Sequence, residues 1–157
     1  MRDGSVVFIF LWILLTAAGC TLTFSEKDKS LRDLLSRLRS VQGEYERSSN
    51  RGVWEFKGNR DLFVAIAAYE DFAMPRLVEC LGRTEASAVT VNGRPVPLGV
   101  VCYQALMTTA YYEHGDANGD ITFDWPGYIG PEASPEQLKA AQAAWHDVVK
   151  KKLYVIP

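Results

Sequence analysis

Shortly after the apolar segment at the N-terminus, apolar residues begin to recur at the spacing of an α-helix. Six of them are separated mostly by three or four positions: Leu31, Leu34, Leu35, Leu38, Val41 and Tyr45. This spacing lines one face of an α-helix. Ser30 and Asp33 resemble a capping box, with Asp in place of the usual Glu. The pattern therefore predicts a helix that begins at Ser30.

Three further helices are predicted in the middle of the chain. Apolar positions from Asn59 onward indicate the first of them. Pro75 opens the second, because its missing N–H needs no partner in the first turn of a helix. That helix should end at Gly82, which can adopt the left-handed conformation at a helix end. The run Leu98 to Tyr112 is apolar around most of the helical wheel, so we expect it to form the central buried helix.

The last predicted helix has the clearest start. Ser134 stands at the N-cap, Pro135 occupies the first turn, and Gln137 takes the capping-box position. Three consecutive lysines mark its C-terminal end, where the helix dipole favours cations. The apolar tail Leu153 to Ile156 would follow, either as an irregular segment or as a short closing strand.

One segment breaks the helical pattern. Between residues 88 and 97, Val89 and Val91 alternate with a threonine, and Asn92-Gly93 is the strongest short signal for a hairpin turn. Pro95 and Pro97 cannot donate to a strand ladder, so any strand here should lie at a sheet edge. We expect a short β-ribbon or an ordered loop here, within an otherwise mainly α domain.

The helices between residues 59 and 112 resemble the paired helices of HEAT repeats. The segments MPRLVECL (74–81) and PLGVVCYQAL (97–106) each place leucine and valine on one side. The resemblance covers fewer than two repeat units, whereas a solenoid of this kind needs about three. It implies a small mainly helical domain, either HEAT-like or an orthogonal bundle, and it implies nothing about chemistry.

The N-terminus has the layout of a secretory signal. The apolar run Val6 to Leu15 is followed by the small residues 17–19 and then by Cys20. This junction resembles the lipobox of bacterial lipoprotein precursors, although Ala17 stands where that family usually has Leu. The resemblance implies that the signal is removed and that Cys20 is lipidated.

This resemblance implies a division of the chain into a signal peptide (1–19), a lipidated tether (20–30) and one globular domain (31–157). The lipid on Cys20 would hold the protein on a membrane of the bacterial cell envelope, facing the periplasm. Thr21, rather than Asp, follows the cysteine, and this implies the outer membrane rather than the inner. The alternative is an uncleaved anchor, because the uncharged stretch is close to the ~20 residues that span a bilayer.

The remaining cysteines fit the same compartment. If Cys20 carries lipid, Cys80 and Cys102 are left, and an oxidising periplasm favours a disulfide between them. The alternative is two buried free thiols that act as small apolar core residues.

Charge and motifs exclude several functions. The formal net charge is -2, whereas nucleic-acid binding needs a basic face, so we expect no nucleic-acid partner. The sequence contains no Gly-x-Ser-x-Gly, His-Glu-x-x-His or Walker motif, and nothing in it indicates a cofactor. Acid–base chemistry would have to use Glu113, His114 and Asp116. We favour the interpretation of His114 as an exposed loop residue.

Residues 113–131 form a long predicted loop, a kind of segment that is often functional. Four of its residues have part of the spacing of an EF-hand calcium loop: Asp116, Asn118, Asp120 and Asp124. However, Ile121 stands where that loop needs glycine, and Gly127 stands where it needs a bidentate Glu. We therefore favour a turn whose side chains bond to their own backbone, with no bound metal.

The same loop carries two large aromatic residues, Trp125 and Tyr128. Exposed, they would be anchors for a binding partner. Buried, they would pin the loop onto the core, which is the interpretation that we favour because Trp is mostly buried on average.

These observations predict a lipid-anchored envelope protein that binds a protein partner and catalyses no reaction. A more specific alternative is a periplasmic inhibitor or immunity protein that blocks a cell-wall hydrolase. A third hypothesis is a hydrolase of envelope glycans or peptides that uses Glu113, His114 and Asp116. A purely structural spacer is also compatible with the sequence.

Overall fold

In the computed structural model, the described residues are 24–49, 53–112 and 125–157. The chain divides into two units, Met1–Asp33 and Leu34–Pro157. In the first unit, residues 24–33 are helical, and Arg32 forms an ion pair with Asp28 one turn earlier. The predicted helix start at Ser30 is therefore wrong. The described part of the expected tether, residues 24–30, is helical.

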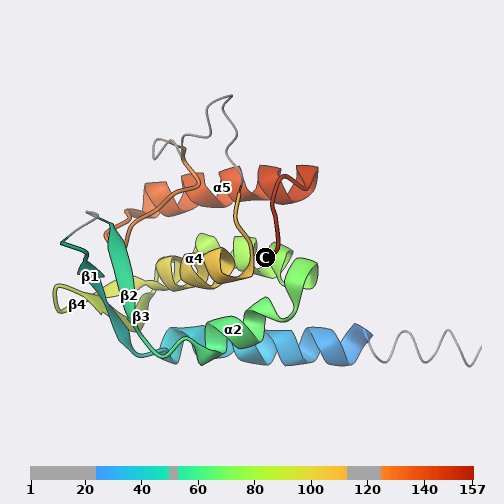
Figure 1. Cartoon of the computed structure of the whole chain (residues 1–157), viewed down its shortest axis with the longest axis horizontal. Helices are drawn as coiled ribbons and strands as arrows, with labels where there is room; N and C mark the ends of the chain where they lie inside the picture. The colour runs from blue at the N-terminus through green and yellow to red at the C-terminus, as the bar shows by residue number, and fades with distance from the viewer. Residues whose placement is uncertain (1–23, 50–52, 113–124) are drawn as a thin grey trace, which may run out of the picture. The chain divides into compact units, whose positions relative to one another are not determined.

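The second unit contains a four-stranded mixed sheet (Figure 1). Its strands are β1 (Gly43–Arg47), β2 (Trp54–Gly58), β3 (Ala86–Val91) and β4 (Arg94–Pro97). The strand order is β2-β1-β3-β4, in which β1 and β3 are parallel and the two outer pairs are antiparallel. A parallel pair needs a long crossover connection, and helices supply it here.

The helices of this unit pack on the sheet and on one another. They are η1 (Leu38–Ser40), α2 (Asp61–Ala67), η2 (Glu70–Phe72), α3 (Met74–Leu81), α4 (Leu98–Thr109) and α5 (Pro135–Lys151). Helix α4 contacts η1, α2, α3, β3 and β4, and α5 packs on α3 (Figure 1). The prediction of a central buried helix in this region is therefore confirmed.

One face of the sheet carries the core. Burial alternates along the strands, so that Tyr45, Phe56 and Val89 are buried while their neighbours Glu44 and Glu46 are exposed. This period of two is expected for a strand with one buried face. The ring of Phe56 meets Phe63 of α2 at 5.4 Å between centroids. The helices therefore cover the face of the sheet that bears the odd-numbered residues of β1.

The fold class is α/β. Of the residues that the structure describes, 54% are helical and 18% lie in strands. The prediction of a mainly α domain, HEAT-like or an orthogonal bundle, is therefore wrong. The apolar pattern that predicts a helix extends from Leu31 to Tyr45. However, Tyr45 belongs to β1, where pairing with two neighbouring strands fixes an extended backbone.

The β-ribbon predicted at residues 88–97 is confirmed and forms half of the sheet. Asn92 and Gly93 have φ angles of 50° and 72°, which is the conformation that two-residue hairpin turns require. Pro95 and Pro97 lie on β4, at one edge of the sheet, where a missing donor costs nothing.

Two further helix ends can be compared with the sequence. Ser134 and Gln137 form the predicted capping box, with each side chain bonded to the other residue's backbone. Gly82 ends α3 as predicted, but its φ of -74° is not left-handed. The tail closes against the end of α4 through paired backbone bonds between Tyr111 and Val155.

A disulfide joins Cys80 of α3 to Cys102 of α4, with 5.8 Å between the Cα atoms. Both cysteines are buried. The structure thus brings the two predicted partners together at disulfide distance. The bridge links the crossover connection to the central helix.

Candidate functional site

The second unit has a cleft that is walled by aromatic side chains and has a volume of about 360 Å³. We call it the aromatic cleft. Its side-chain lining comes from four separate segments and includes Tyr45, Trp54, Val100, Tyr103, Gln104 and Tyr128. Val53 and residues 129–131 complete the described lining.

The sheet positions two of these aromatic residues, Tyr45 and Trp54. Tyr45 of β1 and Phe56 of β2 are register partners, and their rings meet edge to face at 5.6 Å between centroids. Trp54 lies two residues before Phe56 on the same strand. Because side chains alternate along a strand, Trp54 and Phe56 share one face. Tyr45 and Trp54 therefore both point to the helical side of the sheet.

Helix α4 supplies the opposite wall. Val100, Tyr103 and Gln104 stand at positions i, i+3 and i+4, which lie on one face of a helix. The hydroxyl of Tyr45 donates to Oε1 of Gln104 at 3.5 Å, a long hydrogen bond that connects the two walls. The cleft is thus formed where β1, β2 and α4 meet.

The phenol groups of the cleft stay neutral. Burial raises the pKa of Tyr45 and of Tyr103 well above the ordinary tyrosine value. For Tyr103, a backbone hydrogen bond to Ile129 opposes this effect in part. Burial also raises the pKa of Tyr128, and nearby Tyr112 adds to this rise. All three hydroxyls therefore keep their protons at neutral pH and can donate hydrogen bonds.

The described lining of the aromatic cleft carries no formal charge. Its side chains are aromatic, aliphatic or amide groups, with no Asp, Glu, Lys, Arg, His or Cys among them. A lining of this kind suits a neutral ligand that offers apolar surface and hydrogen-bond acceptors.

Of the two predicted binding-loop aromatics, Tyr128 lines this cleft and Trp125 does not. The Trp125 ring packs at 4.5 Å from Tyr112 and 5.4 Å from Trp145 between centroids. Trp145 is fully buried. These contacts hold the segment against α5, which corresponds to the pinning interpretation for Trp125. The ring of Trp125 also meets Tyr128 edge to face at 5.2 Å.

The other predicted site residues lie outside the described ranges. This applies to Cys20 and to the possible catalytic or calcium-binding residues Glu113, His114, Asp116, Asn118, Asp120 and Asp124. Within the described ranges, no group of three or more His, Cys, Asp or Glu side chains could hold a metal ion.

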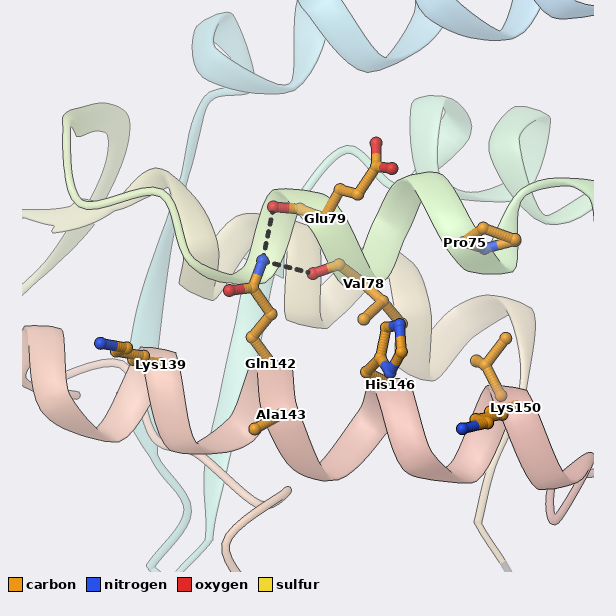
Figure 2. A pocket seen from close by; sticks show the side chains of 9 residues that line it. Pro75, Val78, Glu79, Lys139, Gln142, Ala143, His146 and Lys150 are labelled. Carbon is orange, nitrogen blue, oxygen red and sulfur yellow. Dashed lines mark hydrogen bonds between the residues drawn. The ribbon is translucent and has the colours of Figure 1, made fainter.

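A second hollow, of about 480 Å³, lies between α3 and α5. Figure 2 shows Gln142 reaching from α5 to the end of α3, where its Nε2 donates to the carbonyl oxygens of Val78 at 3.1 Å and Glu79 at 3.0 Å. The amide of Gln142 thus serves helix–helix packing. His146 and Ala143 are exposed along the same hollow. We call it the α3–α5 groove.

No protein-family model matches the chain, and searches of curated proteins and of solved structures find no similar protein. In residues 24–49, 53–112 and 125–157, no helix is both long and apolar enough to cross a membrane.

The sequence contains no motif that could have revealed the aromatic cleft. Tyr45, Trp54, Tyr103 and Tyr128 are spread over more than half of the chain, and only Tyr128 was singled out by its loop. Their convergence depends on the pairing of β1 with β2 and on the packing of α4 beneath them.

Proposed function

We propose that the protein is a lipid-anchored component of the bacterial cell envelope whose α/β domain binds a partner through the aromatic cleft, without catalysing a reaction. The partner would be a protein of the same compartment. The observation that carries the proposal is the character of the cleft: aromatic walls, neutral hydroxyl and amide groups, and no charged side chain among the described lining residues.

Aromatic residues are well suited to such a role. Tyr and Trp provide large contact areas, lose little conformational freedom on binding, and dominate the energetics of many interfaces. Tyr45 is buried and Tyr103 is half-buried, which restricts both rings. The cleft is therefore organised before a partner arrives, which lowers the entropic cost of association.

The anchor part of the proposal depends on the lipobox-like junction that ends at Cys20. The Cys80–Cys102 disulfide supports it, because structural disulfides persist in oxidising compartments and are rare in the cytosol. Several acyl chains on one cysteine would give stable membrane attachment, since each buried CH₂ contributes about 0.8 kcal/mol.

Replacing Cys20 with serine tests the anchor. We expect Cys20→Ser to lack the mass of the acyl chains and to accumulate as an unprocessed precursor. The same mass and the same membrane fraction as the parent chain would contradict lipidation. The disulfide would form in both chains and serves as a check on folding.

Affinity purification from envelope extracts tests the binding function. The full chain in detergent should retain a stoichiometric protein, and the Tyr128→Ala and Trp54→Ala variants should lose it. Because His146 lies in the α3–α5 groove, His146→Ala is the matched control and should retain the partner. A partner that cleft variants still retain would contradict binding at the cleft. Recovery of a cell-wall hydrolase would support the alternative of an inhibitor, which an assay of the hydrolase with and without the protein would then test.

A further inference from the structure

We propose that the ligand of the aromatic cleft is an extended, proline-rich peptide segment of the partner, bound in the polyproline II conformation. This inference rests on the proposed function of the cleft as a binding site, and it specifies the chemistry of the ligand. Segments of this kind typically bind to grooves lined by aromatic side chains.

The first argument is the hydrogen-bonding capacity of the cleft. Within the described residues, neither Trp54 Nε1 nor Gln104 Nε2 has a hydrogen-bond partner, and no buried side-chain nitrogen or oxygen lacks one. Both nitrogens therefore reach solvent. Indole and amide nitrogens only donate hydrogen bonds. The cleft thus offers unused donors, and it calls for a ligand that is rich in acceptors.

A polyproline II segment has the matching property. It contains no internal hydrogen bonds, so all of its carbonyl oxygens remain available. Its proline residues have no N–H, so they bring no donors that need partners. Its conformation is largely set before binding, which reduces the entropic cost.

The shape of the cleft gives the second argument. Trp54 and Tyr45 stand on the sheet and Tyr103 stands on α4, so flat rings face the cleft from two layers. A volume of about 360 Å³ accommodates a few compact pyrrolidine rings and excludes a folded element such as a helix, whose diameter is about 10 Å.

Gly130 has no side chain that could cover the indole ring of Trp54. A Cβ atom added at Gly130 would lie 3.6 Å from Cδ1 and 3.7 Å from Nε1 of Trp54, with no other neighbour within 4 Å. Such an atom would cause no clash, but a longer side chain at this position would cover the indole nitrogen. Gly130 therefore leaves the Trp54 donor accessible to a ligand.

A saccharide is the competing ligand class for an aromatic cleft. Each hydroxyl of a sugar both donates and accepts, so a sugar needs acceptors as well as donors in its site. In this cleft the amide oxygen of Gln104 already accepts from Tyr45, and no carboxylate is among the described lining residues. Tyrosine hydroxyls can also accept, but the unused nitrogens of Trp54 and Gln104 only donate, and this favours the peptide.

Calorimetric titration of the full chain in detergent tests the inference. The probes are a proline-rich decapeptide, the same peptide with alanine in place of proline, and a chitin oligosaccharide. We expect only the proline-rich peptide to bind. Because no charged group takes part, its affinity should change little with salt.

Two variants locate the binding. Gly130→Leu should weaken binding at least tenfold by covering the indole nitrogen without removing any native contact. Trp54→Phe keeps a ring and removes the donor, which should weaken binding about 2–10-fold. Ala143→Leu adds the same kind of bulk in the α3–α5 groove (Figure 2) and should leave binding unchanged.

The outcomes separate this inference from the proposed function. Equal binding of the proline-rich and alanine peptides, or no binding of either, would overturn the inference. Saccharide binding that Gly130→Leu abolishes would also overturn it, while the cleft would remain a binding site. Unchanged peptide affinity in Gly130→Leu would place the peptide elsewhere. The proposed binding at the cleft fails if the cleft variants retain the native partner in affinity purification.

Discussion

The indole Nε1 of Trp145 donates a hydrogen bond to the carbonyl oxygen of Gly127 at 3.0 Å. Trp145 is fully buried on α5, and Gly127 lies one residue before Tyr128. This bond therefore ties the segment that contributes Tyr128 to the aromatic cleft onto the last helix. Trp125 packs on the same indole ring, so the segment is fixed by both a polar and an aromatic contact.

Replacing Trp145 with phenylalanine should destabilise the protein by about 2–3 kcal/mol, because the variant leaves a cavity and deprives the Gly127 carbonyl of its donor. Chemical denaturation of the variant and the parent chain measures the difference in the free energy of unfolding. The adjacent His146 is exposed on the same helix, and His146→Ala should stay within about 0.5 kcal/mol of the parent. Equal stability of the two variants would show that the bond contributes little.

Gly99 allows the close approach of α4 to the end of α3. A Cβ atom at this position would lie 2.2 Å from the carbonyl oxygen of Leu81 and 3.0 Å from that of Arg83. The Gly99 N–H also donates to Arg83 at 2.8 Å, so the helix cannot move away without losing this bond.

We therefore expect Gly99→Ala to destabilise the protein by about 1–3 kcal/mol or more, the usual cost of overpacking. Thermal unfolding measures the effect. Gly130→Ala is the matched control, because its added Cβ makes only ordinary contacts, and it should change stability by about 0.5 kcal/mol at most. A neutral Gly99→Ala would mean that α4 can shift without cost.

The parts of the fold that the sequence predicts correctly are those that local chemistry controls. The capping box at Ser134 and Gln137 fixes the start of α5. The Asn92-Gly93 turn needs two residues that tolerate positive φ angles, and it closes β3 and β4. Each of these signals involves residues within a few positions of one another, so it survives in any tertiary context.

The strands β1 and β2 lack such a signal. Gly43 and Gly58 are register partners, and a Cβ atom on either would come within 2.7 Å of the Phe56 ring. Their role is to make room for this ring, which becomes apparent only when the two strands pair. The parallel pairing of β1 with β3 joins residues far apart in sequence, and periodicity cannot report it. The aromatic cleft depends on the pairing of β1 with β2, which also joins residues from separate segments, and it was missed for the same reason.

Reduction of the Cys80–Cys102 disulfide should lower the free energy of unfolding by about 3 kcal/mol. The bridge spans 22 positions, and in the chain-entropy model a loop of this size restricts the unfolded chain by that amount. Urea denaturation with and without a thiol reductant measures the difference. A double variant with alanine at both cysteines should be less stable than the oxidised parent and should not respond to the reductant. Equal stability of the oxidised and reduced parent would contradict the prediction.

The hydroxyl of Tyr154 in the C-terminal tail donates to Oδ1 of Asp71 in η2 at 2.5 Å. Burial, followed by this hydrogen bond and by the charge of Asp71, raises the pKa of Tyr154 to about 12. The ordinary tyrosine pKa is about 10. The folded chain thus holds this proton more tightly than the unfolded chain does. The stability that Tyr154 contributes is fully present below about pH 10 and is lost as the pH rises through about 12.

The Tyr154→Phe variant isolates this contribution. It should be less stable than the parent near neutral pH, and the difference between the two free energies of unfolding should shrink as the pH rises from about 10 to about 12. The contributions of Tyr45 and Tyr103 to the free energy of unfolding also fall as the pH rises. Both residues are present in the parent and in the variant, so their effect cancels in the difference. Asp71→Asn removes the charge and should lower the pKa of Tyr154, as followed by tyrosinate absorbance. A stability difference that stays constant over this range would show that Tyr154 titrates no differently in the folded and unfolded chains.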